Sequence, residues 1–581
     1  MTTADFASVL IANRGEIAVR VIRTCRDLGL RTIAVYADSD SDSLHVQIAD
    51  EALPLPGITP ADTYLNIPAI LAAAMTSGAE AVHPGYGFLS ESAEFASAVQ
   101  TAGIVWIGPP PKAIEALGDK VTARNIAMLV GAPLAAGTPG PVTDVAEVLD
   151  FADRHGLPIA IKAAFGGGGR GMRVVRDMND ITTAFDAARR EALVAFGRDE
   201  CFVERYLDRP RHVEAQILAD THGNVVMVGT RDCSLQRRHQ KLVEEAPAPF
   251  LSPEQVTSMK DAAEAICRQA EYVGAGTVEF LLDSTGALSF LEVNTRLQVE
   301  HPVTEQTTGL DLVAEQINIA RGLPLTVTST PSPVGHAFEF RINCEDPGAG
   351  FAPQPGVIEQ WELPQGPGIR VDSGVEQGSV VSGQFDSMVA KLIVSGPDRR
   401  TALARSRRAL AETQILGVAT VLGFDAAVLA DPDFIAADGN FGVHTEWIHD
   451  NLQRLVPLDE AKPDLERLPV TIGRTTFWID VPGLQGLGER ATPILEQVAG
   501  GRSGAALVDD REDVVSPMQG TIVAVSVSNG DRVEIGDAIA VVEAMKMENK
   551  VIAHRAGKIA ELEIAPGDTR RQGGTLCRII N

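Results

Sequence analysis

The sequence has little of three features that each point to a particular class of protein. It has only six cysteines in 581 residues and no CxxC pair, too few for a disulfide framework, which favours a reducing compartment. Positive charge is scarce, because 50 Lys and Arg face 77 Asp and Glu, for a formal net charge of −27. The chain therefore lacks the basic surface that nucleic acids and anionic membranes attract.

Long apolar runs are also missing. Nowhere do about 18 apolar residues follow one another, and the first residues lack the basic and apolar regions of a secretory signal. We expect a cytoplasmic protein with no nucleic-acid or membrane partner. The length and the 45% hydrophobic content predict several cores and about three or four domains.

The start of the chain alternates strand and helix patterns. Residues 8–13 are apolar, residues 16–29 have helical periodicity and end at glycine, and residues 31–37 are apolar again. This order predicts a βαβ unit with a parallel sheet. Changes of pattern, including a proline-rich break after residue 107, divide the chain at 1–113, 114–330, 331–450, 451–513 and 514–581.

The last part of the chain contains an internal repeat. Residues 520–542 align with residues 557–579 at a constant offset, and the glycines at 520, 530 and 536 then coincide with those at 557, 567 and 573. Two copies of a strand, turn and strand unit predict a small β-sandwich with approximate two-fold symmetry, because neither copy covers its apolar face alone.

One lysine, Lys546, lies between the two copies. Apolar strands end near Val542 and begin near Val551, so we expect Lys546 at an exposed hairpin tip, where a lysine is usually only a solvated charge. The tetrapeptide Ala544-Met545-Lys546-Met547 on a repeat-built sandwich, however, resembles the biotinyl domain of biotin-dependent carboxylases. Lipoate-carrying domains usually show Asp-Lys-Ala there. The resemblance implies biotin attached to Lys546.

A glycine run follows a predicted strand that carries Lys162. The four glycines are Gly166, Gly167, Gly168 and Gly169, and their bare backbone N–H groups suit a loop that closes over phosphates. The run matches neither the Walker A loop nor the dinucleotide fingerprint, and alone it is equally compatible with a plain flexible loop.

A third pattern is a predicted hairpin over residues 276–296, with a turn at residues 283–286. Glu279 on one strand would lie near Glu292 on the other, with Asn294 on the same face because side chains alternate along a strand. These hard oxygen ligands suit Mg²⁺, or Mn²⁺, at nucleotide phosphates. The alternative is a polar, solvent-facing side of an edge hairpin.

A strand lysine, a glycine lid and a carboxylate hairpin, in that order, resemble the ATP-grasp fold. The segments "IANRGEIAVR", "HPGYGFLSE", "IKAAFGGGGRGMR", "RDCSLQRRHQKLVEEAPAP" and "EVNTRLQVEHPVTE" resemble the biotin carboxylase family over most of residues 1–450. The implied fold class is multidomain α/β plus β. It has an N-terminal α/β (preATP-grasp) domain, an ATP-grasp domain, a β-rich C-terminal domain, a short linker or docking piece and a flattened β-sandwich biotinyl domain.

The same resemblance implies roles for individual residues. Around the nucleotide we expect Lys120, Lys162, Glu204, His212, Gln236 and His239. Metal binding is expected at Glu279, Glu292 and Asn294, and bicarbonate binding at Arg296, Gln298 and Val299. Glu300 would remove the bicarbonate proton, Lys241 would face the phosphoryl oxygens, and Arg341 would sit against the biotin ureido oxygen. We interpret His83 as structural, because the glycines and proline after it form a turn.

The implied function is that of the α chain of an acyl-CoA carboxylase, which carboxylates its own biotin with ATP and bicarbonate. No segment is long enough for a carboxyltransferase, so a separate β subunit is expected, together with a biotin protein ligase and pairing of the carboxylase domain. Two alternatives stay open: an ATP-grasp ligase that does not use biotin, and a non-catalytic biotin carrier. The sequence does not name the acyl-CoA.

Overall fold

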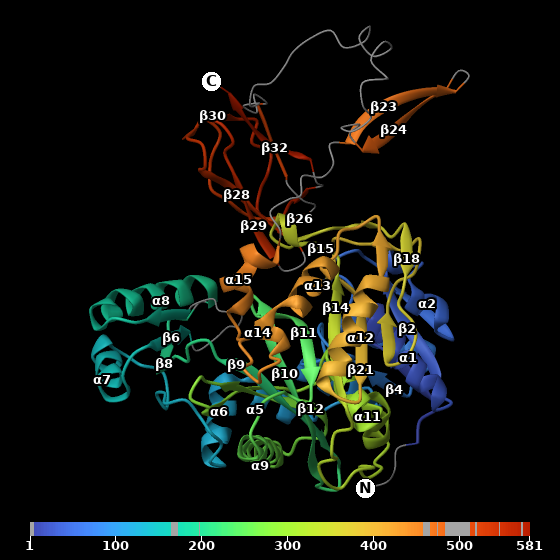
Figure 1. The fold of residues 1–581 in the computed structure, drawn as a ribbon, viewed down its shortest axis with the longest axis vertical. Coiled ribbons are helices and arrows are strands. Elements are labelled where there is room, and N and C mark those ends of the chain that lie inside the picture. The colour runs from blue at the N-terminus through green and yellow to red at the C-terminus, as the bar shows by residue number, and fades with distance from the viewer. Residues whose placement is uncertain are drawn as a thin grey trace. The chain divides into compact units, whose positions relative to one another are not determined.

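The computed structural model describes residues 5–163, 172–196, 198–456, 465–472, 475–482, 512–516, 520–544, 547–570 and 573–580. The chain forms two compact units, one of residues 1–345 with 354–452, and one of residues 346–353 with 453–581 (Figure 1). Among the described residues, no helix combines the length and the apolar character of a membrane span. All six cysteines are buried free thiols.

The first unit begins with a parallel five-stranded sheet in the order β3-β2-β1-β4-β5. All four residues of β1 are buried, and α1 packs an apolar face against the sheet, which confirms the predicted βαβ opening. The strands are β1 (Ser8–Ile11), β2 (Arg31–Ala37), β3 (Glu51–Leu55), β4 (Ala81–His83) and β5 (Val105–Trp106). The helices are α1 (Gly15–Asp27), α2 (Leu44–Ile48), α3 (Ile67–Ser77), α4 (Ala93–Thr101) and α5 (Pro111–Gly118).

An eight-stranded sheet in the order β13-β12-β9-β10-β11-β14-β21-β19 is the centre of this unit. Its β11–β14 pairing continues the sheet across the predicted boundary at residue 330, so the ATP-grasp and C-terminal regions share one sheet. The strands are β9 (Arg211–Ala219), β10 (Val225–Arg237), β11 (Gln240–Ala246), β12 (Gly274–Leu282), β13 (Leu288–Asn294), β14 (His336–Asn343), β19 (Ile369–Ser373) and β21 (Met388–Gly396).

Helices cover both faces of the large sheet. On one face, Val213, Ile217 and Phe280 pack against Met259 and Ala263 of α9, whose start is fixed by a capping box at Ser252. The helices around this sheet are α6 (Lys120–Leu129), α9 (Pro253–Gln269), α10 (His301–Thr308), α11 (Leu312–Ala320), α12 (Arg399–Glu412), α13 (Leu422–Ala430), α14 (Pro432–Ile435) and α15 (Trp447–Leu455).

A smaller sheet, β7-β6-β8, carries two helices of its own (Figure 1). It consists of β6 (Ile159–Ala163), β7 (Met172–Val175) and β8 (Cys201–Arg205) with α7 (Val145–His155) and α8 (Ile181–Phe196), around a separate apolar core. The remaining strands of the C-terminal region are short pairs: β15 (Glu345–Asp346), β16 (Ala352–Pro353), β17 (Gly356–Val357), β18 (Gln360–Glu362), β20 (Val380–Val381) and β22 (Gln414–Leu416).

The second unit contains the predicted sandwich, as two four-stranded sheets, β25-β32-β30-β27 and β29-β28-β26-β31. Its core includes Ile522 and Ile559, which are equivalent positions in the two copies of the repeat. The strands are β25 (Asp513–Val515), β26 (Gly520–Val525), β27 (Arg532–Val533), β28 (Ala538–Ala544), β29 (Met547–Ile552), β30 (Gly557–Ala560), β31 (Thr569–Arg570) and β32 (Thr575–Ile580).

The hydrogen bonds of the sandwich repeat with the sequence. The Gly530 N–H donates to the Ile559 carbonyl, and the equivalent Gly567 N–H donates to the Ile522 carbonyl. Both glycines have φ of +99°, a region that side chains disfavour. These matched contacts confirm the predicted two-fold repeat.

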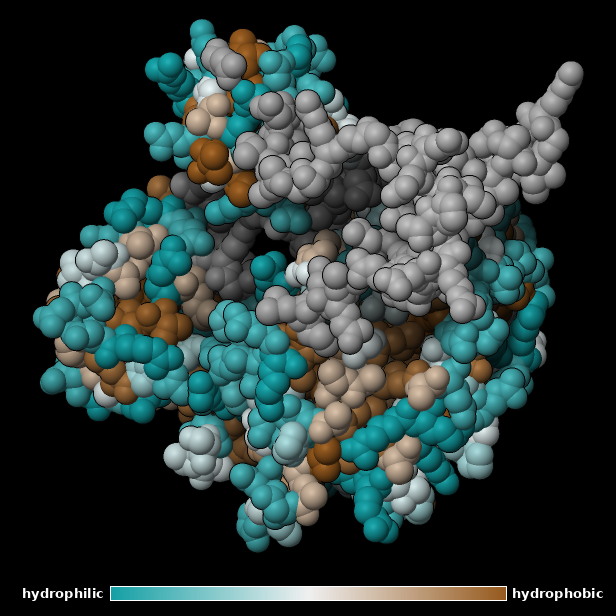
Figure 2. Space-filling view, turned by 45° about the horizontal axis from the view of Figure 1, so that its top comes forward, coloured by the Kyte–Doolittle hydropathy of each residue, from teal (hydrophilic) through white to brown (hydrophobic). Residues whose placement is uncertain are grey.

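Within residues 451–513, the strands β23 (Leu465–Ile472) and β24 (Thr475–Pro482) form an antiparallel pair. Hydrophilic residues occupy much of the described surface in Figure 2, with smaller apolar areas between them. This agrees with the strongly acidic composition.

Candidate functional site

One face of the eight-stranded sheet collects most of the predicted site residues. Directly opposed residues in antiparallel strands share a face, so the Cα pairs Glu214–Glu279 and Glu279–Glu292 place three carboxylates side by side. Arg231 on β10 opposes Glu214 and joins the same face. The polar side of the predicted hairpin is therefore part of a buried site, since Glu279 is 4% exposed.

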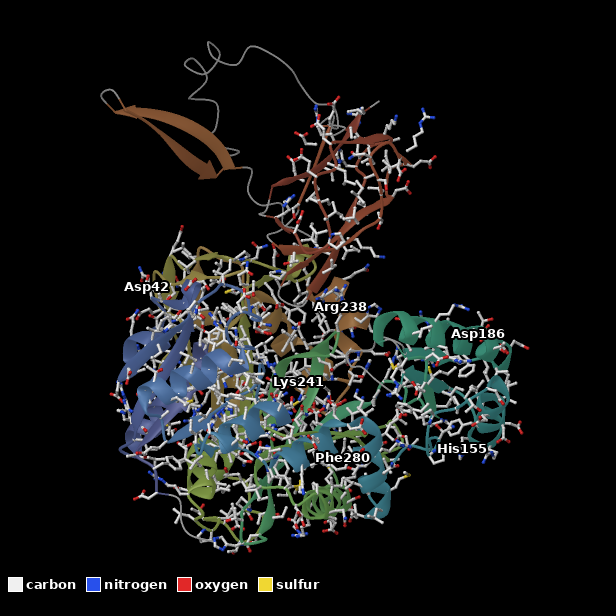
Figure 3. All side chains as sticks on the ribbon, turned by 180° about the vertical axis from the view of Figure 1, so that it is seen from behind. Asp42, His155, Asp186, Arg238, Lys241 and Phe280 are labelled. Carbon is white, nitrogen blue, oxygen red and sulfur yellow. The ribbon has the colours of Figure 1, made fainter. Side chains whose placement is uncertain are left out.

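A β-bulge turns Lys241 onto that face. Leu235 pairs with Val243 but Gln236 pairs with Lys241, so Leu242 is an extra residue on β11 and the alternation of side chains shifts by one. Lys241 lies near the centre of the sheet (Figure 3). Its ammonium binds Glu214, Glu279 at 3.1 Å and Glu300 at 2.8 Å. The predicted phosphoryl-facing lysine is thus the cation that joins three carboxylates.

Glu300 is fully buried between two cations. Its carboxylate accepts from Lys241 and, at 2.9 Å, from Nη2 of Arg341, whose Nε donates to Glu244 at 2.6 Å. Burial alone would raise the pKa of Glu300, but the charges of Lys241 and Arg341 outweigh it and hold this pKa below its ordinary value. The proposed base is therefore kept ionised, as a proton acceptor requires.

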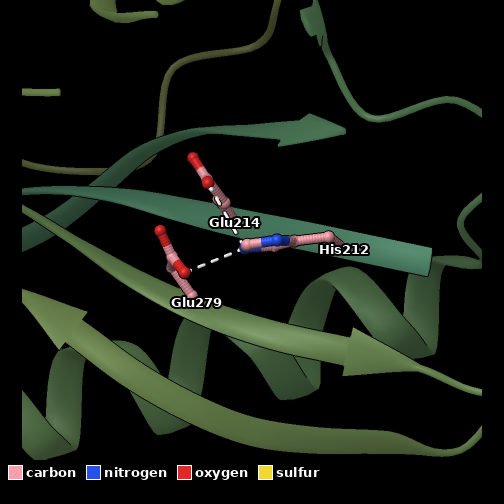
Figure 4. Close-up of side chains that lie close together, drawn as sticks. All are labelled: His212, Glu214 and Glu279. Carbon is pink, nitrogen blue, oxygen red and sulfur yellow. Dashed lines mark ion pairs between the residues drawn. The ribbon is translucent and has the colours of Figure 1, made fainter. Parts of the chain in front are cut away.

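The predicted metal ligands lie together. Glu279 accepts from Nδ2 of Asn294 at 2.7 Å, and His212 Nε2 lies 2.9 Å from the other oxygen of Glu279 (Figure 4). Burial and the neighbouring Glu279 charge both raise the pKa of Glu292. Two adjacent carboxylates with an amide oxygen form a hard donor set whose mutual repulsion a divalent cation would relieve, so the residues fit Mg²⁺.

Cations and polar groups predicted at the nucleotide also converge. Lys120, at the start of α6, lies 3.9 Å from Glu292, and Lys162 on β6 forms an ion pair with Glu204 on β8. Gln236 Nε2 lies 3.3 Å from Nδ1 of His212. All three contacts link different strands or helices.

His239 lies in the tight turn between β10 and β11. It and Arg238 have φ of +67° and +49°, which non-glycine residues seldom adopt outside such turns and functional sites. Burial lowers the pKa of His239, and the positive charges of His212, Lys162 and Lys120 lower it further. Four basic groups thus surround one place, as a polyphosphate requires.

The segment 295–300, between β13 and α10, carries the predicted bicarbonate residues. Arg296 donates to Glu91 at 2.9 Å and to Asn294 at 3.2 Å, and Gln298 donates to Glu279 at 3.0 Å. Among the described residues, none accepts a hydrogen bond from the backbone N–H groups of residues 296–300. Unpaired N–H groups ahead of a helix are suited to bind an anion.

Five of the predicted site residues lie outside the part of the chain that the structure describes. They are Lys546 and the four glycines from 166 to 169. The strands around Lys546 are described, and Ala544 is the Cα partner of Met547. His83 is buried, and its Nδ1 accepts from the Gly85 N–H at 3.0 Å, which agrees with the structural interpretation.

The sequence interpretation missed five charged residues that hold the site together: Glu91, Glu214, Arg231, Glu244 and Lys391. Each binds a predicted site residue or its neighbour from a distant strand or loop. Glu91, Arg231 and Glu244 lie within segments that carried the resemblance, but no spacing rule marked their side chains as facing the site.

Four family models match the chain in order. They are the biotin carboxylase N-terminal domain (residues 5–114), the carbamoyl-phosphate synthase L chain ATP-binding domain (119–328), the biotin carboxylase C-terminal domain (339–450) and the biotin-requiring enzyme domain (512–579). The biotin-dependent acyl-coenzyme A carboxylase alpha3 subunit of Mycobacterium leprae is 54% identical, over 99% of each chain. The chain belongs to the α subunits of biotin-dependent acyl-CoA carboxylases.

Other comparisons agree with this family. The propionyl-CoA carboxylase α chain of Sus scrofa is 36% identical over 99% of this α subunit and 91% of its own length. The biotin carboxylase of Campylobacter jejuni, solved as a "beta-gamma-ATP" complex, has a TM-score of 0.73 at 40% identity and covers 77% of this chain and 99% of its own.

A biotin carboxylase domain dimer from Hydrogenobacter thermophilus 2-oxoglutarate carboxylase, solved with MgADP and bicarbonate, has a TM-score of 0.73 at 43% identity. It covers 78% of this chain and 100% of its own. The α subunit is accordingly an ATP-dependent biotin carboxylase joined to a biotinyl domain. The alternatives of a biotin-independent ligase and of a non-catalytic carrier are not supported.

Proposed function

We propose that this α subunit carboxylates biotin held on its own Lys546, using ATP, Mg²⁺ and bicarbonate, and that a separate carboxyltransferase β subunit passes the carboxyl group to an acyl-CoA. The observation that carries the proposal is the ionised Glu300 between Lys241 and Arg341, on the sheet face that also bears the metal-binding carboxylates.

The residues divide the chemistry among them. Bicarbonate is a weak nucleophile, so it must be oriented at the γ-phosphate of ATP while the developing negative charge is neutralised. Lys120, Lys162 and His239 face the nucleotide, and Glu279, Glu292 and Asn294 would hold Mg²⁺, which supplies positive charge at the phosphate oxygens.

Glu300 takes the bicarbonate proton. In the unliganded site its proton affinity is low, because Lys241 and Arg341 both bind its carboxylate. When those cations turn to substrate oxygens, Glu300 loses opposing charge and becomes a stronger base. Arg341 is then available to stabilise negative charge on the biotin ureido oxygen.

The partners follow from the family and the domain content. A carboxyltransferase β subunit completes the reaction, a biotin protein ligase loads Lys546, and two carboxylase regions pair, as in the solved dimer of a relative. Residues 451–513 serve as a linker or a reduced docking domain. Six buried free thiols suit a cytoplasmic location.

The proposal is tested by purifying the native complex on streptavidin and following labelled bicarbonate into acetyl-, propionyl- and long-chain acyl-CoA with ATP and Mg²⁺. We expect ATP-dependent label in a thioester and a second chain that co-elutes. Label confined to the chain's own biotin would contradict the acyl-CoA step, and failure to bind the resin would contradict biotin on Lys546.

A further inference from the structure

Lys391 is a buried cation that the reaction scheme does not use. It lies on β21, is 0% exposed, and reaches segment 295–300 from the C-terminal region. Its ammonium donates to the Val299 carbonyl at 2.8 Å, and it lies 3.4 Å from Glu16 of α1 and over the Tyr86 ring at 5.7 Å. One ammonium therefore contacts three different regions of the carboxylase unit.

A buried ammonium needs protein groups that replace the water molecules it loses. Moving a lysine out of water is costly unless an opposite charge or strong acceptors replace the lost water. Glu16 is itself buried, and no described residue donates a well-formed hydrogen bond to its carboxylate. The shortest contact of Lys391 is with a backbone carbonyl, so a simple buried ion pair does not account for its position.

The contacted peptide is the one that joins Val299 to Glu300. A trans peptide is planar, with its C=O and N–H on opposite sides, so a fixed Val299 carbonyl also fixes the direction of the Glu300 N–H. A charged donor on the carbonyl polarises that peptide and strengthens the N–H as a donor. The N–H groups of residues 296–300 are those left without a described acceptor.

Segment 295–300 is irregular, yet it is held on two sides. Glu91 of the N-terminal region accepts from the Thr295 N–H at 3.2 Å and from Arg296 at 2.9 Å. Lys391 holds the other end, next to Glu300. Regular hydrogen bonding does not fix this stretch, so side-chain contacts such as these two hold it in place, together with the hydrogen bond from Gln298 to Glu279.

We propose that Lys391 is a positioning residue for bicarbonate: it holds the Val299 carbonyl so that the backbone N–H groups of segment 295–300 and the Glu300 carboxylate face the anion. This inference rests on the proposed function, because it assigns bicarbonate to this segment. Lys391 acts through the backbone and does not touch the nucleotide-binding residues Lys120, Lys162 or His239 in the described structure.

The test compares Lys391→Met with Glu16→Gln in the full chain. Lys391→Met is expected to raise both the KM for bicarbonate and its Kd, measured by calorimetry, by about 10- to 100-fold, the size of one lost charge-assisted hydrogen bond. The KM for ATP should stay within about twofold, because no ATP contact changes. Glu16→Gln keeps the Lys391–Val299 bond and should leave bicarbonate binding within about twofold.

Two further variants keep the test decisive. Lys260→Met, at a half-buried lysine on α9, is the matched control for the substitution itself and should change neither constant. If Lys391→Met alone does not fold, the double variant Glu16→Gln/Lys391→Met removes the unpaired buried carboxylate and carries the same expected rise in bicarbonate KM.

The outcomes separate this inference from the proposed function. Unchanged bicarbonate KM and Kd in the Lys391 variants, with normal cleavage in the unaltered chain, would overturn the role of Lys391 alone. A parallel rise in the KM values for ATP and bicarbonate would also overturn it, because that pattern indicates general loss of structure. Absence of bicarbonate-dependent ATP cleavage in the unaltered chain would overturn the proposed function itself.

Discussion

The carboxylase site and the biotinyl sandwich are built in opposite ways. In the carboxylase unit, seven strands of one sheet and two loops bring together charged groups that are up to three hundred residues apart in the chain, such as Glu91 and Lys391. In the sandwich, the fold is made by two copies of one short unit, and the residues around Lys546 are close in sequence. A catalytic site needs many groups in fixed relation, whereas a carrier needs one accessible amine.

Substitution of Lys546 is the most complete way to separate the two regions. Lys546→Ala should remove biotin attachment and abolish acyl-CoA carboxylation, while ATP cleavage driven by free biotin continues, because the carboxylase sheet is unchanged. The measurement is streptavidin binding together with both assays. Lys550→Ala, at an exposed residue of β29, is the matched control. Loss of free-biotin activity in Lys546→Ala would show that the two regions do not act independently.

Glu300→Gln tests the catalytic half. Removing the proton acceptor should lower bicarbonate-dependent ATP cleavage by about 10²- to 10⁴-fold without unfolding the chain. A steady-state ATPase assay with and without bicarbonate, alongside circular dichroism, measures this. Near-normal cleavage in the variant would refute Glu300 as the base. The exposed Glu254, changed to glutamine, should leave the rate unchanged.

Glu244→Gln tests whether the position of Arg341 depends on its hydrogen bond to Glu244. Arg341 Nε loses a charged acceptor at 2.6 Å, so carboxylation of free biotin should fall about 10- to 100-fold at an unchanged KM for ATP. The neighbouring Glu245 is the control, because it faces the other side of the sheet and binds His336 and Arg399 at 2.7 Å. Glu245→Gln should lower stability but leave carboxylation of free biotin unchanged; an equal loss of carboxylation in the two variants would contradict the role of the Glu244–Arg341 contact.

Substitution of Glu16 is expected to have the smallest effect, and to change the stability of the fold rather than the rate of the reaction. Burial raises the pKa of Glu16 from 4.5 to about 7, although the Lys391 charge opposes this. The folded state therefore holds the proton more tightly, and its stability falls as the pH rises through this range, with the full cost above about pH 7.

Glu16→Gln removes this loss of stability at high pH, because glutamine does not ionise. Relative to the unaltered chain, the variant should gain roughly 3 kcal/mol of unfolding free energy between about pH 4.5 and pH 8. Urea denaturation of the carboxylase unit at both pH values measures the difference. A variant whose relative stability does not change with pH would show that the pKa of Glu16 is not raised in the folded state.

The predictions that came from local pattern agree with the structure. Period-two alternation and a turn located the Glu279 and Glu292 hairpin in its correct register, and the constant repeat offset predicted the two-fold repeat of the sandwich. The exact domain limits at residues 113, 330, 450 and 513 stay predictions, as do the individual roles of the site residues.

Other parts of the site were not accessible from local pattern. The bulge at Leu242 moves Lys241 to the sheet face that carries Glu214 and Glu279. No residue type in that strand predicts a bulge. Glu91 and Lys391 contact the site across 205 and 92 positions of the chain, and Arg231 contacts Thr304 across 73 positions, beyond the reach of any periodicity.

The sequence by itself determined the family, the carboxylate hairpin and the repeat, and it predicts Lys546 as the biotin-bearing residue, because each depends on spacing within a short stretch of chain. Only the tertiary structure decided how the charges balance: which cations hold Glu300 ionised, and which side chains hold segment 295–300. The physical reason is that the energy of a buried charge depends on its neighbours in space, and the strands that supply these neighbours are adjacent in the sheet but distant in the sequence.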